Sequence, residues 1–334
     1  MMMHQAIWHG GDIGAARALF PDAPEPWIDL STGINPYSYP LPDIPASAWR
    51  RLPGRVEEAA LLDAARRAYR VPETAGIVAA PGTQILIELL PLLVPGKGRV
   101  AVVGPTYGEH ARAWRKAGHA VEEVADLAAA GGADVVVLVS PNNPDGRTVA
   151  PARLATLGRD LAAHDRLLVV DEAFADFAGG TSLVPFLPPA TVILRSFGKT
   201  YGLAGLRLGF AIAEPALAHA LADRLGPWAV AGPALQVGTC ALGDTAWLSA
   251  AARARAADAA RLDVLLARVG RVAGGTDLFR LLETDEAAAL FGRLGRAGIY
   301  VRRFQDQPDR LRFGLPGSEA AWTRLEAALP INRR

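Results

Sequence analysis

Two residues of this chain place a reactive side chain close to an apolar stretch. Asp171 follows four apolar residues, and Lys199 lies within Ser196-Phe-Gly-Lys-Thr-Tyr-Gly202, just after another expected strand. A partly buried lysine has a lowered pKa, and its neutral amine can attack a carbonyl to form a Schiff base. A carboxylate at the edge of a dry site can keep a heterocyclic nitrogen protonated. We therefore expect Lys199 and Asp171 to be catalytic.

The segment Gly82-Thr83-Gln84 indicates where a phosphate would bind. It opens an expected helix, and the first backbone amides of a helix have no partner within the helix, so they can hold an anion. Ser196 could add a hydroxyl and Arg207 a guanidinium to the same phosphate.

Two further residues suit a flat aromatic ligand. Tyr107 could stack on its ring, and Asn143 could donate a hydrogen bond to a phenolic oxygen. Each signal is weak alone, because a tyrosine more often packs than stacks. A Schiff-base lysine, an acid for a ring nitrogen, a phosphate cup and a stacking aromatic together describe pyridoxal 5′-phosphate (PLP).

The elements that must position these residues read as an α/β layout. Continuous apolar runs, as expected for strands buried on both faces of a parallel sheet, alternate with helical stretches. In open α/β sheets ligands bind outside the carboxyl ends of the strands, so the polar loops that follow five of these runs predict one shared site. A purely structural role explains Gly and Pro in such loops, but not Asp171 and Lys199. The expected strands are Ile77–Ala80, Arg99–Val103, Asp134–Ser140, Leu167–Val170, Thr191–Leu194 and Leu208–Ala213.

The length of 334 residues favours about two domains. We expect an N-terminal arm over residues 1–50 that is part of a small domain, a large cofactor domain over 51–242, and a C-terminal small domain over 243–334. In the last of these, Ala246–Val269 predicts one long helix, with Arg253, Arg255, Arg261 and Arg268 on a solvated face.

Composition excludes several classes of protein. The net charge of +1 gives no electrostatic case for nucleic acid or an anionic membrane. The lone Cys240 excludes an internal disulfide and fits a reducing compartment, so we expect a cytoplasmic protein. No secretory signal opens the chain, the uncharged segment Leu225–Gly243 is interrupted by Gly and Pro, and the histidines show no pairing that would bind a metal.

Three motifs, in this order, resemble those of the class I/II aminotransferase-fold PLP enzymes. They are Pro141-Asn-Asn-Pro-Asp-Gly146, Asp171-Glu-Ala-Phe174 and the lysine motif that runs from Ser196 to Gly209. Within that group the chain is most similar to histidinol-phosphate aminotransferases and L-threonine-O-3-phosphate decarboxylases. The opening His9-Gly-Gly-Asp-Ile13 and Ile28-Asp-Leu-Ser-Thr-Gly-Ile-Asn-Pro36 look like the decarboxylase branch, which serves cobalamin biosynthesis.

The resemblance implies a fold type I homodimer, with a mostly parallel seven-stranded sheet in the large domain and a small α+β domain. It implies that Lys199 binds the cofactor covalently, that Asp171 partners the pyridine nitrogen, and that Arg312 grips the substrate α-carboxylate. The cofactor residues that it implies are Gly82, Thr83, Gln84, Tyr107, Asn143, Asp171, Ser196, Lys199 and Arg207. Those for the substrate are His9, Gly33, Asn143, Arg302 and Arg312.

Two positions depart from the family pattern. Phe174 stands where many aminotransferases have a tyrosine that bonds the ring oxygen, and Phe is familiar there in the decarboxylase branch. Leu52 stands where related enzymes often have a tyrosine that reaches the partner subunit's site, so the phosphate contact from that tyrosine is missing.

The expected activity is decarboxylation of L-threonine O-3-phosphate to (R)-1-amino-2-propanol phosphate. The first alternative is a histidinol-phosphate-type aminotransferase, because a small rotation of the substrate decides which bond breaks. The second is a non-catalytic PLP-fold binding protein, against which Lys199 and Asp171 argue.

Overall fold

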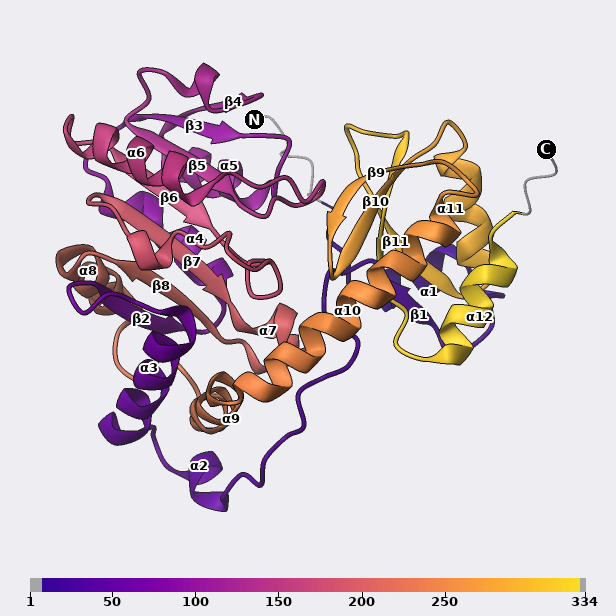
Figure 1. The fold of residues 1–334 in the computed structure, drawn as a ribbon, viewed down its shortest axis with the longest axis horizontal. Coiled ribbons are helices and arrows are strands. Elements are labelled where there is room, and N and C mark those ends of the chain that lie inside the picture. The colour runs from indigo at the N-terminus through magenta and orange to yellow at the C-terminus, as the bar shows by residue number, and fades with distance from the viewer. Residues whose placement is uncertain (1–7, 331–334) are drawn as a thin grey trace. The chain divides into compact units, whose positions relative to one another are not determined.

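The computed structural model describes residues 8–330, which form two compact units (Figure 1). The first unit combines the chain up to Tyr37 with the chain from Ala251 onward, and the second runs from Ser38 to Ala250. Helix α10 (Thr245–Leu266) contains the second boundary between them. We describe each unit by itself.

The second unit is built on a seven-stranded sheet in the order β2-β8-β7-β6-β5-β3-β4. All neighbouring pairs are parallel except those made by β8, which is antiparallel to both β2 and β7. This confirms the predicted α/β fold and the mostly parallel sheet. The strands are β2 (Gly76–Ala80), β3 (Arg99–Val103), β4 (Ala120–Val124), β5 (Val135–Val139), β6 (Leu167–Asp171), β7 (Thr191–Ser196) and β8 (Gly209–Ala213).

Six of the seven strands match the predicted apolar runs, and the edge strand β4 was missed. Its sequence Ala-Val-Glu-Glu-Val carries two exposed glutamates and forms no continuous apolar run. An edge strand pairs on one side only and tolerates charge, so apolar continuity does not reveal it.

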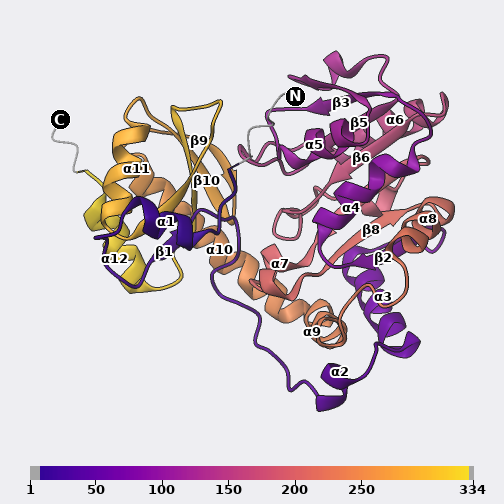
Figure 2. The same ribbon diagram turned by 180° about the vertical axis from the view of Figure 1, so that it is seen from behind.

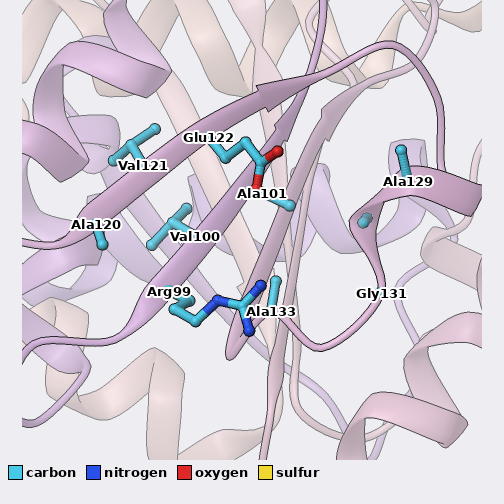
Figure 3. A pocket seen from close by; sticks show the side chains of 10 residues that line it. Arg99, Val100, Ala101, Ala120, Val121, Glu122, Ala129, Gly131 and Ala133 are labelled. Atoms are coloured by element: carbon cyan, nitrogen blue, oxygen red, sulfur yellow. The ribbon is translucent and has the colours of Figure 1, made fainter.

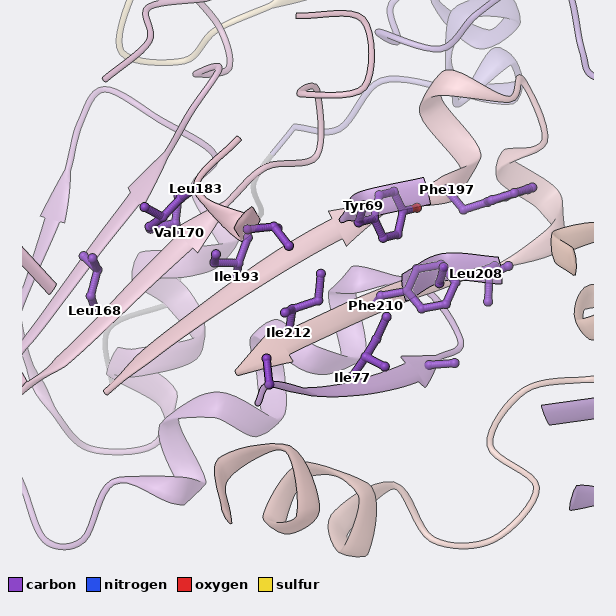
Figure 4. Close-up of a cluster of buried hydrophobic side chains, with 14 of the residues drawn as sticks. Tyr69, Ile77, Leu168, Val170, Leu183, Ile193, Phe197, Leu208, Phe210 and Ile212 are labelled. Atoms are coloured by element: carbon purple, nitrogen blue, oxygen red, sulfur yellow. The ribbon is translucent and has the colours of Figure 1, made fainter. Parts of the chain in front are cut away.

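Helices cover both faces of this sheet, and each face has its own core (Figures 1 and 2). The α3-side core packs one face against α3 (Arg55–Tyr69), α6 (Pro151–Ala162) and α9 (Gly232–Gly243), and Figure 4 shows part of it. The α5-side core packs the other face against α4 (Thr83–Leu89), α5 (Glu109–Lys116) and α8 (Pro215–Leu225). The remaining helical segments of this unit are α2 (Ala46–Arg50), α7 (Phe197–Thr200), η1 (Leu90–Leu93), η2 (Ala128–Ala130), η3 (Val184–Phe186) and η4 (Ala204–Leu206).

Strand residues alternate between the two cores, as side chains of a strand must. On β6 and β7, Val170 and Ile193 lie in the α3-side core, whereas Val169 and Leu194 lie in the α5-side core. This alternation decides which face receives each polar residue at the strand ends.

The first unit holds a five-stranded sheet in the order β1-β11-β12-β10-β9. Its core gathers residues from this sheet, from the helices and from the second half of α10. The short β1 and the glycine-containing β9 were not predicted, while the predicted helix Ala246–Val269 corresponds to α10, which ends at Leu266. The elements are α1 (Ile13–Leu19), β1 (Ile28–Leu30), β9 (Arg271–Thr276), β10 (Phe279–Glu283), α11 (Ala287–Arg296), β11 (Ile299–Arg303), β12 (Arg310–Gly314) and α12 (Glu319–Ala328).

One arginine of α10 contradicts the predicted solvated face. Arg255 is buried, with only 6% of its surface exposed. Its guanidinium pairs with Asp258 at 2.6 Å, donates to Asn35 at 3.1 Å and lies 4.1 Å from the centre of the Tyr37 ring. The spacing of charged residues along this helix predicts an exposed face, but it cannot show that the loop carrying Asn35 and Tyr37 packs against Arg255.

One cavity of about 270 Å³ lies beside the first halves of β3 and β4, next to η2 (Figure 3). It is lined mostly by small and aliphatic side chains, with Arg99 and Glu122, and it contains none of the predicted site residues. In the part of the chain that the structure describes, no helix is long and apolar enough to cross a membrane.

Candidate active site

Asp171 ends strand β6 on the face of the α5-side core and is 4% exposed. One carboxylate oxygen lies 3.0 Å from His110 Nε2, and the other accepts the backbone N–H of Ala173 at 2.9 Å. Burial by itself would raise the pKa of Asp171, but the hydrogen bond and charge of His110, together with Lys199, outweigh burial and lower it. The carboxylate is therefore held ionised, as a partner for a protonated ring nitrogen must be.

His110 is a site residue that sequence reasoning missed. It lies in the first turn of α5, is fully buried, and its ring stands edge-on to that of Tyr107, with the ring centres 6.1 Å apart. Nothing in the residue pattern links it to Asp171, which is 61 positions away. Its only signal is that it lies three residues after Tyr107, which is itself a predicted site residue.

Lys199 lies in the short helix α7, directly after strand β7. Its Nζ donates to Ser196 Oγ at 3.3 Å and lies 5.2 Å from the centre of the Phe174 ring. Its charge is also one of the influences that lower the pKa of Asp171. The structure thus brings the two predicted catalytic residues and Ser196 together.

The residues predicted to hold a phosphate meet around Gly82, whose φ is +86°. A Cβ added there would come within 2.7 Å of the Arg207 guanidinium, and one added to Gly209 would come within 2.8 Å of the Thr83 backbone nitrogen. These two glycines therefore keep open a cradle bordered by a guanidinium and by the first amides of α4. A phosphate suits such a donor set.

Gln84 and Tyr107 contact each other by their side chains. The Tyr107 hydroxyl donates to Gln84 Oε1 at 3.0 Å, and Gln84 Nε2 lies 3.4 Å from a carboxylate oxygen of the buried Glu109. The Gln84 carboxamide is therefore engaged with the tyrosine, and its backbone amide is the group that could face a phosphate.

Asn143 is half-buried in the loop after β5. This loop is tied to the rest of the site on both sides. The Ser140 amide donates to the Asp171 carbonyl at 2.9 Å, and Thr106 Oγ1 donates to Asn142 Oδ1 at 2.6 Å. The loops that carry Tyr107, Asn143 and Asp171 therefore lie next to one another, as the carboxyl ends of adjacent parallel strands must.

The first unit contains four of the five predicted substrate residues, His9, Gly33, Arg302 and Arg312, whereas Asn143 lies in the second unit. Arg302 on β11 and Arg312 on β12 are direct cross-strand partners. Burial, with a further contribution from the charge of Arg302, lowers the pKa of Arg312 to about 9. Arg312 is buried and Arg302 is half-buried, and two like charges placed opposite each other in this way favour a bound anion.

The N-terminal motif reaches the same region of the first unit. Arg312 donates to the Ser31 carbonyl at 2.9 Å, and the Gly11 amide donates to Ser31 Oγ at 2.7 Å. Gly33 is buried in the loop that continues from Ser31, and His9 is exposed next to the glycine pair. The structure therefore brings the His9-Gly-Gly segment, the Gly33 loop and Arg312 together in one unit.

The polar groups of the second unit fit PLP on chemical grounds. A lysine amine, an ionised buried carboxylate, a phosphate cradle and a tyrosine on a neighbouring loop are a set of groups that suits this cofactor. Among the described residues, no group of three or more His, Cys, Asp and Glu side chains could hold a metal ion.

Comparison with known proteins agrees with this fold. The chain is 46% identical to a threonine-phosphate decarboxylase of Sinorhizobium sp., over 98% of each chain, and 44% identical to that of Pseudomonas aeruginosa, over 96% of each. Among solved structures it is similar to histidinol-phosphate aminotransferase from Sinorhizobium meliloti in complex with pyridoxal-5′-phosphate. There the TM-score is 0.77 at 23% identity, over 95% of this chain and 93% of the other. Residues 56–329 match the family described as aminotransferase class I and II, and the chain belongs to that family.

Proposed function

We propose that this chain is a PLP-dependent carboxy-lyase that converts L-threonine O-3-phosphate to 1-amino-2-propanol phosphate and carbon dioxide. The observation that carries the proposal is the similarity, over nearly the whole chain, to two threonine-phosphate decarboxylases. The geometry of both units supports it, since one holds a donor set for PLP and the other a paired-arginine site for an anionic substrate.

In this proposal the second unit binds the cofactor. Lys199 forms the covalent link, and Asp171, kept ionised by His110, partners the pyridine nitrogen. The cradle of Gly82, Thr83, Ser196 and Arg207 holds the cofactor phosphate, Tyr107 covers the ring and Asn143 donates to its oxygen. When bound, PLP supplies an electron sink for the pair of electrons left when a bond to the substrate Cα breaks.

The first unit binds the two acidic groups of the substrate. Arg312 takes the α-carboxylate, and Arg302 with His9 takes the phosphate, while the Gly33 loop lies close to Arg312. Contacts to both acidic groups orient a flexible substrate, and its orientation selects which bond to Cα breaks. Positioning by these side chains therefore decides between decarboxylation and transamination.

We also propose a homodimer that works in the cytoplasm and serves cobalamin biosynthesis, the role of the branch that the N-terminal motif resembles. Large apolar side chains that are exposed in the single chain support a partner surface. They include Leu41, Trp49, Leu52 and Val56, which follow one another in a short segment of the second unit.

The reaction type is tested by incubating the purified holoenzyme with O-phospho-L-threonine and no keto acid. We expect carbon dioxide and the phosphorylated amine to form over many turnovers. A single turnover per site, with further reaction only after 2-oxoglutarate is added, would instead establish the aminotransferase alternative. A matched incubation with histidinol phosphate plus 2-oxoglutarate measures that alternative directly.

A further inference from the structure

We propose that Arg195 is a positioning residue that holds the carboxyl ends of β6 and β7 in register from the face of the sheet opposite the candidate active site. This proposal rests on the proposed cofactor, because the residues that it positions are those assigned to PLP. Arg195 directly precedes Ser196, and its ion-pair partner Glu172 directly follows Asp171. Each residue is therefore one peptide bond away from a site residue.

Arg195 is the centre of a buried cluster that it forms with Glu172, Asp176 and Tyr69. One guanidinium nitrogen donates to Glu172 Oε2 at 2.7 Å, and the other pairs with Asp176. The guanidinium also lies 4.5 Å from the centre of the Tyr69 ring. Arg195 is 4% exposed and Glu172 is 1% exposed, so solvent does not screen these charges.

Strand alternation places this cluster behind the site. Val170 and Ile193 are in the α3-side core, so the residues two positions later, Glu172 and Arg195, continue on that face. Tyr69 belongs to the same core, and Figure 4 shows it beside the strands that carry these residues. Asp171 faces the other side, where it meets His110 of α5. The cluster therefore cannot touch the cofactor, and it acts through the backbone.

The same cluster closes the loop that brings Phe174 to Lys199. Glu172 accepts the backbone N–H of Leu183 at 2.6 Å and the Ser182 hydroxyl at 2.7 Å, which fixes the far end of the loop. Asp176, within the loop, is held by Arg195. The Phe174 ring, 5.2 Å from Lys199 Nζ, is thereby fixed by contacts made on the other face.

The chemistry requires an arginine here. Burial by itself would lower the pKa of Arg195, but Asp176 and Glu172 raise it above its ordinary value, so the guanidinium stays charged. Its planar fork reaches two carboxylates at once, whereas a lysine ammonium is a single point of charge. Because a buried ion pair often stabilises no more than apolar residues of the same volume, its value here is the geometry that it imposes.

The test compares Arg195→Lys and Arg195→Met with Leu154→Ala, a cavity variant of the fully buried Leu154 on α6 in the same core. The readouts are the melting temperature, the dissociation constant for PLP, the pH midpoint of the visible absorbance of the holoenzyme, and kcat and KM. We expect Arg195→Lys to fold and to bind PLP about tenfold more weakly, as loss of a supporting residue commonly does. The pH midpoint of its visible absorbance should shift, and kcat should fall by a larger factor than KM rises. Leu154→Ala should lower the melting temperature but leave the midpoint and PLP affinity unchanged.

A triple variant separates positioning from stability. Arg195→Met combined with Glu172→Gln and Asp176→Asn removes all three buried charges together, so we expect its melting temperature to recover relative to Arg195→Met alone while PLP affinity stays low. If PLP affinity recovers with stability, or if Arg195→Lys matches the wild type in affinity and midpoint, the positioning role is overturned. If the wild-type chain itself binds no PLP, the proposed function is overturned. If the wild type binds PLP and only the results for the Arg195 variants differ from those expected, the positioning role alone is overturned.

Discussion

The pKa of Asp171 is lowered at a place where burial alone would raise it. His110 outweighs the cost of burial, with the charge of Lys199 helping. Burial and the two cationic neighbours therefore shift the pKa of this one carboxyl group in opposite directions. The two neighbours, His110 and Lys199, lie on different elements, α5 and α7. Changing either neighbour should alter how Asp171 titrates.

His110→Gln tests this balance. The pKa of Asp171 in the wild type is lowered, so its ionisation adds stability at any pH above its unfolded value of about 3.9, and this stability is lost as the pH falls through the folded value. The variant raises that folded pKa, so the wild type should be more stable by about 1.5–3 kcal/mol near pH 7. The gap should narrow as the pH falls below about 5. Urea unfolding of the cofactor-free protein at several pH values measures it.

His164→Gln provides the control for that series, because His164 is exposed and its Nδ1 lies 2.8 Å from the backbone carbonyl of Asp160, in its own helix region, rather than from a carboxylate. The free energy of unfolding of His164→Gln should stay close to that of the wild type across the same pH series. A His110→Gln gap that stays constant or widens in acid would contradict the assignment.

Lys199 is the lysine expected to bind the cofactor covalently. Lys199→Ala should remove the visible absorbance of the bound cofactor, since no other lysine lies on a site loop. Lys97→Ala and Lys116→Ala should keep it, and Lys116 instead pairs with Glu88 on the surface. Borohydride reduction followed by peptide mapping checks the assignment, and label on Lys97 or Lys116 would show it to be wrong.

At the scale of elements, the register between strands β11 and β12 places the two arginines of the anion site opposite each other. Arg302 and Arg312 belong to different strands, and their antiparallel pairing sets the two guanidinium-bearing residues opposite each other. A shift of the register by one residue would send one of the two side chains to the other face of the sheet. The paired charges therefore depend on β11 and β12 together.

Inorganic phosphate should raise the melting temperature of the wild-type holoenzyme, in which PLP already fills the cradle around Gly82, because the anion relieves the charges of Arg302 and Arg312 and binds only the folded state. The pKa of Arg312 is lowered to about 9, so its charge and the phosphate effect should both decline as the pH rises through that value. Arg312→Gln should abolish the effect. The control Arg310→Gln removes a charge from the same strand that is paired with Glu283 at 2.8 Å, and it should respond to phosphate as the wild type does.

Arg302 with His9 should make the phosphate of the substrate necessary, because their contacts add to the one that Arg312 makes with the carboxylate. Losing one charge-assisted contact costs about 1.5–3 kcal/mol, so kcat/KM for L-threonine should be at least about tenfold below that for its phosphate ester. Steady-state carbon dioxide release with the two substrates measures the ratio. Equal efficiencies would refute recognition of the phosphate.

At the scale of the whole molecule, the single chain leaves a run of large apolar side chains exposed. Trp49 and Leu52 are each 67% exposed and Val56 is 81% exposed, although soluble monomers rarely expose such side chains together. We expect a dimer by light scattering after gel filtration. Trp49→Arg with Val56→Glu should shift it toward monomer, whereas Val264→Glu, on an apolar residue of α10 that is 65% exposed, should not. A wild-type monomer would contradict the proposed homodimer.

Much of the architecture follows from local patterns. The apolar runs of β5, β6 and β7 are continuous because both faces of those strands are covered, so their type and place could be predicted from sequence. Strand β4 and the short β1 could not, because an edge strand needs no apolar continuity and a three-residue strand carries too few residues to show a pattern. The predicted domain boundaries stay a prediction.

The sequence by itself determined that the residues predicted to carry the chemistry lie together at one edge of the sheet. The order of the Gly82, Asn143, Asp171 and Lys199 motifs, each at a strand end, was sufficient, because the carboxyl ends of parallel strands meet at one edge whatever the details of packing. Only the tertiary structure decided what surrounds them. His110 beside Asp171, Arg195 between two carboxylates and Arg302 opposite Arg312 are contacts between elements, set by helix placement and strand register, and no local pattern of residues encodes either.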